Sequence, residues 1–532
     1  LGLDHYAEAI SEISTDATKE LSVENTLRGI ADVWTNVVLD TGPFKEGRDD
    51  VMKLRSADDI FTALEDNTVT LSTLKASKFF SVFERTITSW EKTLGVVNDV
   101  VEMVLKVQLA WMYLENIFIG SEDIARQLPS ETEMFGTINT RFIKLMQEMH
   151  KTSNVVLACT AMRAPDIGDT PDVSLLNELS AMDSNLERIQ KSLDDYLESK
   201  RQMFPRFYFL SNDDLLQILG QAKEPQNIQP HLKGMFEGIK KLEMYAPDPL
   251  TGRRHCESVA MTSPDGETIP FDNPIRTEGR PEEWLNTVEA AMYSATRTHL
   301  ASTFEQCRAK GIKKDKWVKD NPGQMLITAG CISWTMECER ALRDPENVKE
   351  ALKKLRRKWI QYLNKLVELT RTPLDKVTRK KVTALITIEV HARDAIEKLI
   401  KTGCSSPNDF EWVSQLRFYW DRETRHCTVK QVLSVFDYGY EYQGNNGRLV
   451  VTPLTDRCYM TLGAAMFTRR GGNPLGPAGT GKTETVKDFG KALARYVIVF
   501  NCSDGVDYKM TGKMFSGLAQ TGAWACLDEF NR

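Results

Sequence analysis

The chain has 532 residues, of which 41% are hydrophobic and 27% are charged, and its formal net charge is −6. This length has room for several domains, and the composition is ordinary for a soluble globular protein and gives no reason to expect a nucleic-acid partner. We find no run of about 18 apolar residues and no signal peptide, so we expect no membrane partner. The 10 cysteines form no C-x-x-C pair and no metal-ligand spacing with the 7 histidines, which suits a reducing compartment. Because the sequence starts without Met and stops soon after Glu529, we expect a piece of a larger protein.

Residues 1–244 are predicted to be almost entirely helical. Apolar residues recur at steps of three and four near the N-terminus: Ile10, Ile13, Ala17 and Leu21. Two stretches, 130–133 and 211–214, place a serine three residues before an acid and are predicted to be capping boxes that open new helices. The apolar faces of these helices need partners, so we expect helices stacked on helices in an elongated rod.

Residues 245–283 interrupt the helical pattern with prolines and turn residues. The segments 257–262 and 267–271 are short and alternating, and Pro264-Asp265-Gly266 lies between them, so a β-hairpin is predicted. Helical patterning resumes at Pro281, because proline fits the first turn of a helix. The interruption is either a hinge or a passive insertion.

Residues 284–435 are predicted to form a second helical part, which includes a basic stretch. Its basic residues are Lys353, Lys354, Arg356, Arg357, Lys358, Arg379, Lys380 and Lys381. In isolation such a stretch could be a localisation signal or a site for an acidic partner. The alternative is the solvated face of a helix, because Leu352, Leu355 and Trp359 recur at helical spacing within it.

The run Gly476–Thr483 is a complete phosphate-binding loop, G-x-x-x-x-G-K-[ST]. Its glycines let the backbone curl so that N–H groups face the phosphates, while Lys482 reaches the β- and γ-phosphates and the Thr483 hydroxyl can ligate Mg²⁺. The residues predicted to bind nucleotide are Gly476, Pro477, Ala478, Gly479, Thr480, Gly481, Lys482 and Thr483.

The segments after this loop fit a nucleotide-hydrolysing fold. A helix is predicted over 483–496, the apolar run 497–500 is predicted to be a buried strand, and the apolar run 523–527 is predicted to be a Walker B strand. The second run ends in Asp528 and Glu529, of which the first can hold Mg²⁺ and the second can orient and deprotonate the attacking water. This pair favours hydrolysis; the alternative is a loop that binds nucleotide only to stabilise the fold.

Motifs along the whole chain resemble those of dynein heavy chains. Residues 1–435 resemble the dynein linker, most clearly at 281–285, 408–412 and 415–420. Residues 436–532 resemble the N-terminal portion of the first AAA+ module, most clearly at 449–457, 476–485 and 522–532. The resemblance is closest to axonemal chains, and the stretch 496–522 is more similar to inner-arm than to outer-arm chains. The expected fold is therefore mainly α, an elongated helical-bundle linker with a β-hairpin insertion, followed by a truncated α/β P-loop AAA+ domain.

The resemblance implies ATP or ADP and Mg²⁺ as cofactors and adds residues to the site. Adenine is expected near Leu449, Val450, Pro453 and Leu454. Glu484 is expected to join the nucleotide site, and Asn501 matches a position from which the catalytic Glu529 is often held. A polar residue that merely ends a strand is the alternative for Asn501. Leu527 stands where an aromatic residue is common, and we expect only repacking there.

The resemblance further implies a microtubule motor ATPase whose linker acts as a lever across the AAA+ ring, in the axoneme of a cilium or flagellum. Expected partners are microtubules through a stalk, dynein heavy, intermediate and light chains through a tail, and the other AAA+ modules, one of which supplies an arginine finger. Since these parts lie outside the sequence, the isolated piece is expected to be inactive. The alternatives are a structural region that binds nucleotide without turnover and a non-motor AAA+ remodelling ATPase.

Overall fold

The computed structural model of the chain contains two compact units, Leu1–Tyr196 and Leu197–Arg532. The boundary between them along the chain falls within one helix, α7 (Ser174–Met203). Each unit is described separately below. The residues described are 6–45, 50–120, 122–160, 173–221, 225–245, 256–309, 313–344, 346–445, 447–502 and 506–530. The predicted interruption at 245–283 lies partly outside these residues.

The first unit is a helical bundle with one small sheet. Its helices are α1 (Ala7–Asn36), α2 (Asp58–Lys75), α3 (Phe80–Phe118), α4 (Glu122–Gln127), α5 (Pro129–Lys151), α6 (Val155–Cys159) and the first part of α7. Helix α3 forms its centre, because a valine ladder at helical spacing is fully buried: Val97, Val100, Val101, Val104 and Val107. Farther along α3, Trp111 packs between Phe44 and Phe142, with ring centroids 5.0 Å away in each case.

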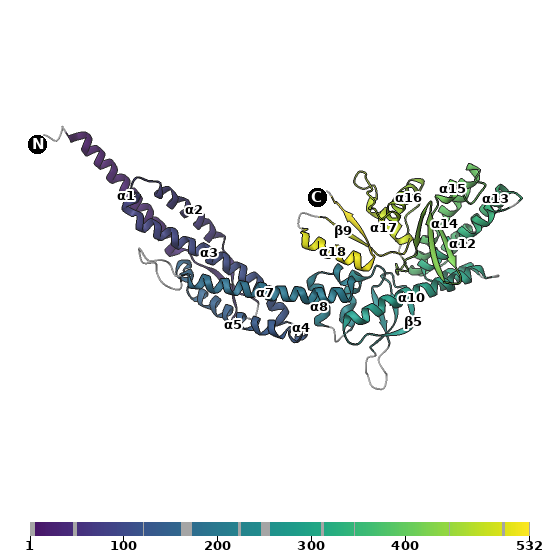
Figure 1. The fold of residues 1–532 in the computed structure, drawn as a ribbon, viewed down its shortest axis with the longest axis horizontal. Coiled ribbons are helices and arrows are strands. Elements are labelled where there is room, and N and C mark those ends of the chain that lie inside the picture. The colour runs from purple at the N-terminus through teal and green to yellow at the C-terminus, as the bar shows by residue number, and fades with distance from the viewer. Residues whose placement is uncertain are drawn as a thin grey trace. The chain divides into compact units, whose positions relative to one another are not determined.

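The predicted apolar face of α1 is not covered over its first half. Ile10, Ile13 and Leu21 are 48%, 70% and 53% exposed, while burial begins at Val23 and continues to Trp34. Figure 1 shows why: within this unit, the N-terminal half of α1 extends past the ends of the other helices. The spacing predicted the helix correctly. The prediction that another helix covers its apolar face is wrong for the first half of α1.

Residues 40–56 contain a sheet where only helix was predicted. Strands β1 (Asp40–Pro43) and β2 (Met52–Ser56) pair antiparallel. The side-chain amide of Gln108 on α3 fixes β2: it accepts from the backbone N–H of Leu54 at 2.7 Å and donates to its carbonyl at 2.9 Å. This contact joins residues far apart in sequence, so a local pattern could not predict it.

One of the two predicted capping boxes is confirmed. The Ser211 hydroxyl accepts from the backbone N–H of Asp214 at 3.1 Å and caps α8 (Asn212–Gly220). The other is wrong, because α5 begins at Pro129 and Ser130 lies inside its first turn. Proline fits that first position, since its fixed φ suits a helix and its missing N–H would have no intrahelical partner.

Among its described residues, the second unit contains the remaining helices and three sheets. Its helical elements after α7 are η2 (Pro205–Phe209), α8, η3 (Pro225–His231), α9 (Leu232–Met235), α10 (Pro281–Arg308), α11 (Lys314–Asp320), α12 (Gly323–Leu342), α13 (Val348–Thr370), α14 (Lys376–Thr402), α15 (Phe410–Val413), α16 (Pro453–Phe467), α17 (Lys482–Ala492) and α18 (Tyr508–Thr521). Its strands are β3 (Lys241–Met244), β4 (Glu257–Thr262), β5 (Thr268–Arg276), β6 (Arg417–Asp421), β7 (His426–Gln431), β8 (Ser434–Asp437), β9 (Val497–Asn501) and β10 (Trp524–Asp528).

Strands β4 and β5 form an antiparallel pair around the predicted turn, where Gly266 has φ +88°. Strand β3, which the sequence did not predict, adds a third strand beside β4. A second antiparallel sheet, β6–β7–β8, occupies 417–437, so the prediction that 284–435 is helical throughout is wrong. Alternating burial along β7, with Cys427 and Val429 inside, is the strand period that this prediction overlooked.

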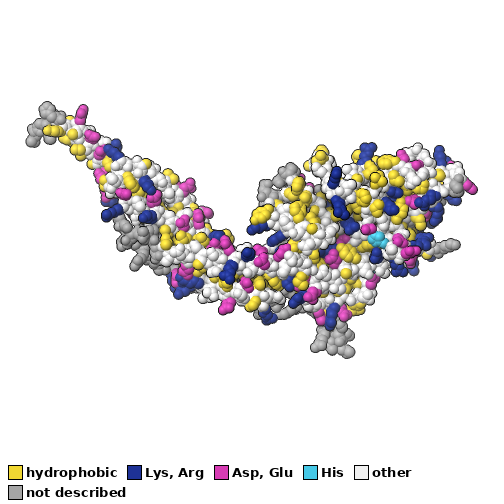
Figure 2. Space-filling view, in the orientation of Figure 1, with side chains coloured by type: hydrophobic (Ala, Val, Ile, Leu, Met, Phe, Trp, Pro, Cys, Tyr) yellow, Lys and Arg dark blue, Asp and Glu magenta, His cyan; other side chains and the backbone are white. Residues whose placement is uncertain are grey.

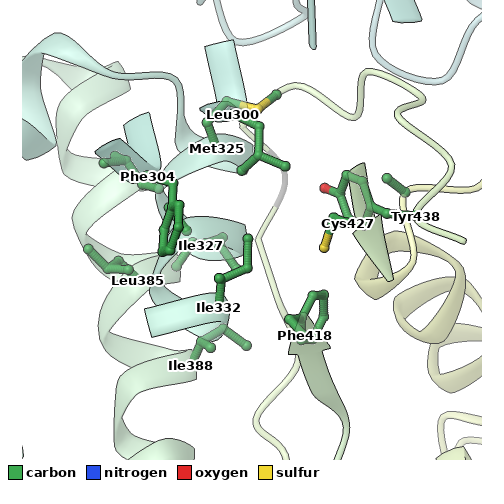
Figure 3. Close-up of a cluster of buried hydrophobic side chains, with 14 of the residues drawn as sticks. Leu300, Phe304, Met325, Ile327, Ile332, Leu385, Ile388, Phe418, Cys427 and Tyr438 are labelled. Carbon is green, nitrogen blue, oxygen red and sulfur yellow. The ribbon is translucent and has the colours of Figure 1, made fainter. Parts of the chain in front are cut away.

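The core of this unit joins helices to the second sheet. Figure 3 shows side chains of α10, α12 and α14 on one side, and Phe418, Cys427 and Tyr438 from the sheet and the following residues on the other. Phe418, Cys427 and Tyr438 are all at least nine-tenths buried. The same core continues into the nucleotide module, where it includes Tyr459 of α16, Phe489 of α17 and Leu493.

The basic stretch is divided between solvent and core. On α13 the apolar residues Leu352, Leu355 and Trp359 are buried, and Lys358 pairs with Glu337 at the surface, so the solvated-face prediction holds there. It is wrong for Lys381, which is 8% exposed, because its ammonium pairs with Glu267 at 3.0 Å.

Candidate nucleotide site

The phosphate-binding loop curls as its glycines predict. Gly479 and Gly481 have φ of +77° and +80°, a region that other residues rarely adopt. Helix α17 then begins at Lys482, whose ammonium donates to the loop carbonyls of Gly476 at 2.8 Å and Pro477 at 2.9 Å. The lysine that would reach the phosphates therefore lies directly over the concave side of the loop. Residues 471–477, which lead into it, form neither helix nor strand.

The two strands of the module bring the predicted metal ligands together. Strands β9 and β10 run parallel, with Asn501 opposite Asp528 at their carboxyl ends. There the Thr483 hydroxyl, in the first turn of α17, donates to the Asp528 carboxylate at 3.1 Å. A hydroxyl beside a carboxylate is the oxygen-ligand set that Mg²⁺ prefers, so the residues fit this ion.

Glu529 lies immediately beyond this pair and is exposed. Its backbone has φ +51°, which is uncommon for a residue with a side chain, and its N–H donates to the Asp528 carboxylate at 3.1 Å. Such backbone geometry concentrates at functional sites. Asn501 is also exposed and is paired in register with Asp528, one residue from Glu529.

The segment predicted to bind adenine presents apolar side chains to solvent. Leu449, Val450 and Leu454 are 36%, 70% and 73% exposed. Pro453 occupies the first turn of α16, which is capped where the Thr452 hydroxyl accepts from a backbone N–H. Exposed apolar groups next to a phosphate loop are suited to cover the face of a base.

An ion pair that sequence reasoning missed anchors this segment to the phosphate-loop helix. Asp488 on α17 is 2% exposed and accepts from the Arg448 guanidinium at 2.9 and 3.1 Å. It also accepts from the backbone N–H of Leu449 at 3.2 Å and from the Tyr459 hydroxyl. Burial acts to raise the pKa of Asp488, but the charge of Arg448 and the hydrogen bonds from Arg448, Tyr459 and Leu449 together outweigh it, so the pKa lies below its usual range. Single charged residues carry no spacing pattern, so the only signal was an acid within an amphipathic helix.

The chain that enters the module is held by a second buried ion pair. The Arg206 guanidinium of η2 donates to both carboxylate oxygens of Glu441, at 2.8 and 2.7 Å, and each side chain is 2% exposed. The backbone N–H groups of Gly439 and Glu441 donate to Leu493 and Ala494 at the end of α17, at 2.9 and 3.0 Å. The helical region is therefore bonded directly to the module.

A third contact joins η2 to α18, the helix between β9 and β10. Gly517 on α18 lies so close to η2 that an added Cβ would stand 2.6 Å from the Tyr208 Cβ. The Gln520 amide donates to the Tyr208 hydroxyl at 3.3 Å, and the Phe209 ring packs edge-on against Tyr496. Figure 2 shows hydrophobic side chains also gathered on the outer surface over α18, where Tyr508 is 81% exposed.

Neither a metal-binding cluster nor a membrane-spanning helix is found within the described part of the chain. No three side chains of His, Cys, Asp or Glu there come together as a metal cluster. No helix among the same residues is both long enough and apolar enough to cross a bilayer.

A glycine-rich loop, a parallel strand pair and an Asp-Glu pair at the strand ends lie together in this part of the chain, an arrangement typical of nucleotide-binding modules. Comparison with protein families agrees: residues 438–532 match the hydrolytic ATP binding site of the dynein motor region, and residues 1–303 match dynein heavy chain, N-terminal region 2. The chain belongs to the dynein heavy chain family.

Similar proteins are axonemal. The chain is 65% identical over 532 residues to the Dynein-1-beta heavy chain of the flagellar inner arm I1 complex of Chlamydomonas reinhardtii. It is 49% identical over 534 residues to Dynein axonemal heavy chain 2 of Homo sapiens. Each match covers 100% of this chain, but the chain spans only 11% and 12% of the two relatives.

Proposed function

We propose that this region binds and hydrolyses ATP for an axonemal microtubule motor, as the names of its relatives suggest. The observation that carries the proposal is the hydroxyl–carboxylate pair of Thr483 and Asp528 beside the phosphate loop. This pair would offer metal ligands to a bound triphosphate. The backbone N–H groups of 476–483 would bind the phosphates and Lys482 would neutralise their charge.

Each residue at the strand ends has a separate role in this proposal. Thr483 and Asp528 would hold Mg²⁺, which supplies charge neutralisation on the phosphates when bound. Glu529 would orient the attacking water and accept its proton, and Asn501 would hold the Glu529 side chain in place. The base would be contacted by Leu449, Val450, Pro453 and Leu454. Glu484, the residue after Thr483, would also be part of the nucleotide site.

We further propose that hydrolysis moves the helical region as a lever and so slides microtubules in a cilium or flagellum. Two physical connections support this mechanism: η2 packs on α18, which runs into β10, and Arg206 binds Glu441 at the entry to the module. Packed elements of this kind shift between discrete arrangements and so can transmit force. The interruption at 245–283 stays a candidate hinge. Microtubules, other dynein chains and the remaining AAA+ modules are the proposed partners.

The Glu529→Gln variant of the intact heavy chain tests the proposed chemistry. Because the amide cannot accept the proton of water, ATP hydrolysis and microtubule gliding are expected to fall by about 10²-fold or more. ATP binding, measured by equilibrium titration, is expected to survive. Unchanged turnover would reject the role of Glu529, because the hydrolysis measured in the intact chain would then not depend on this residue.

A further inference from the structure

Asp488 connects the helix that follows the phosphate loop with the segment proposed to contact the base. It lies on α17, the helix that begins at Lys482 of the phosphate loop. Its hydrogen bonds go to Arg448, Leu449 and Tyr459, all from the segment that contains the proposed base contacts. A single buried carboxylate thus connects the phosphate helix to the base segment.

The base segment depends on this attachment because it has little regular structure of its own. Residues 447–452 form neither helix nor strand, and Leu449 and Val450 are exposed directly beside the anchored Arg448. The bond from the Leu449 N–H fixes the backbone itself, and the two-point bond from Arg448 fixes its direction. Asp488 therefore fixes both the backbone and the Arg448 side chain at the start of the base segment, beside the ring contact of Tyr459 with Phe489 at 5.3 Å.

We propose that Asp488 is a positioning residue that holds the base-binding segment 449–454 at a fixed distance from the phosphate loop, so that the base and the phosphates of one nucleotide are bound together. This inference rests on the proposed nucleotide-binding function. It implies that Asp488 contributes to the affinity for a nucleoside triphosphate and contributes nothing to the affinity for a triphosphate without a base.

The experiment compares ATP with inorganic tripolyphosphate, each with Mg²⁺, as competitors of a fluorescent ATP analogue on the intact heavy chain. In Asp488→Asn we expect ATP affinity to fall by about tenfold, the effect of losing one or two buried hydrogen bonds to a charged group. Tripolyphosphate affinity is expected to change by less than about twofold, because the phosphate loop is untouched. Arg448→Lys keeps the charge but loses the two-point geometry, so we expect the same selective loss to a smaller degree.

The chain offers a matched control for general destabilisation. Glu267 is 4% exposed and, like Asp488, pairs with a basic side chain, that of Lys381, and accepts from a backbone N–H and a tyrosine hydroxyl, those of Gly323 and Tyr442. Glu267→Gln is expected to lower the melting temperature as Asp488→Asn does, while both affinities stay at the wild-type values.

The remaining outcomes separate the inference from the proposed function. If wild-type protein binds ATP but Asp488→Asn loses both ligands equally, or loses neither, Asp488 does not position the base segment. The same conclusion follows if Glu267→Gln reproduces the selective loss of ATP. If wild-type protein binds neither ligand, the proposed function itself is overturned, and this inference with it.

Discussion

The entry to the nucleotide module and the phosphate loop are close in sequence but are built in opposite ways. At the entry, Glu441 is 1% exposed and both of its carboxylate oxygens are bonded to Arg206. In the loop, the backbone is exposed and Lys482 bonds only to carbonyls of the loop itself among its described hydrogen bonds. The comparison shows that the buried, charge-paired contacts lie where the helical region meets the module. The groups suited to phosphate stay accessible to solvent beside this support.

The largest effect should come from breaking the buried pair at the entry. Arg206→Met leaves the Glu441 carboxylate buried without its counter-charge, and the free energy of unfolding is expected to fall by about 3–5 kcal/mol. Urea unfolding followed by tryptophan fluorescence measures this loss. The double variant Arg206→Met with Glu441→Leu should recover much of it, because no charge is then buried. Equal losses in the single and double variants would contradict this account.

A second test uses a carboxyl that is buried but has no cationic partner among its described hydrogen bonds. Burial raises the pKa of Glu389 from 4.5 to about 7, although Trp359 donates to it at 2.7 Å. The folded protein thus holds this proton more tightly than the unfolded chain. The stabilisation is fully present below pH 4.5 and is lost as pH rises through 7.

The expected loss from Glu389 is on the order of 3 kcal/mol, because each tenfold difference in proton affinity between the folded and unfolded chain corresponds to about 1.4 kcal/mol. Melting temperatures from pH 5 to 8 measure it in wild type and in Glu389→Gln, which cannot titrate. The variant should show a flatter profile over this window. Parallel profiles would show that Glu389 is not the group responsible.

The contact between η2 and α18 offers an intermediate effect. In Gly517→Ala the new methyl would stand 2.6 Å from Tyr208 and 2.9 Å from Phe209, so we expect a loss of about 1–3 kcal/mol in unfolding free energy. Gly512→Ala, on the same helix, meets nothing within 4 Å and should stabilise by about 0.5–1 kcal/mol. Thermal unfolding of both variants compares them. Similar behaviour of the two would mean that the close approach does not exist in solution.

The smallest effect on stability is expected in the loop. Lys482→Ala removes only exposed hydrogen bonds, so the free energy of unfolding should change by less than about 0.5 kcal/mol. Nucleotide binding should nevertheless be lost, because the phosphate charge is no longer neutralised. Denaturant unfolding and ATP titration on the same sample measure both. A large loss of stability would erase the contrast between the two regions.

The sequence predicted those features whose signal lies within a few neighbouring residues. The curled glycine loop, the strands β9 and β10 and the Ser211 cap follow from short motifs and local periods, but the prediction that 497–500 is buried is wrong, because Val499 of β9 is 39% exposed. Strand β7 of the sheet β6–β7–β8 had such a signal, because Cys427 and Val429 alternate with polar residues in the sequence, but it was overlooked within a region predicted as helical. Lys381 was placed in solvent because its partner Glu267 lies far away in the chain.

The anchors of the candidate site were beyond prediction for the same reason. Arg448 and Asp488 are 40 positions apart, and nothing in either residue's neighbourhood indicates that the two side chains meet. Gln108 and Leu54 are similarly separated by 54 positions. Tertiary contacts between single polar residues require the fold to be known first, whereas periodic patterns do not.

The Arg206–Glu441 pair also sets an order of events during protein synthesis. The two residues are 235 positions apart, and ribosomes add roughly 5–20 residues per second, so the arginine is made roughly 10–50 seconds before its carboxylate partner. Until Glu441 is made, Glu289 is the one available of the two described carboxylates that Arg206 pairs with in the fold, at 3.0 Å, and full burial of the guanidinium without the two-point bond to Glu441 would be costly. Closure of this core therefore waits until translation has passed Glu441.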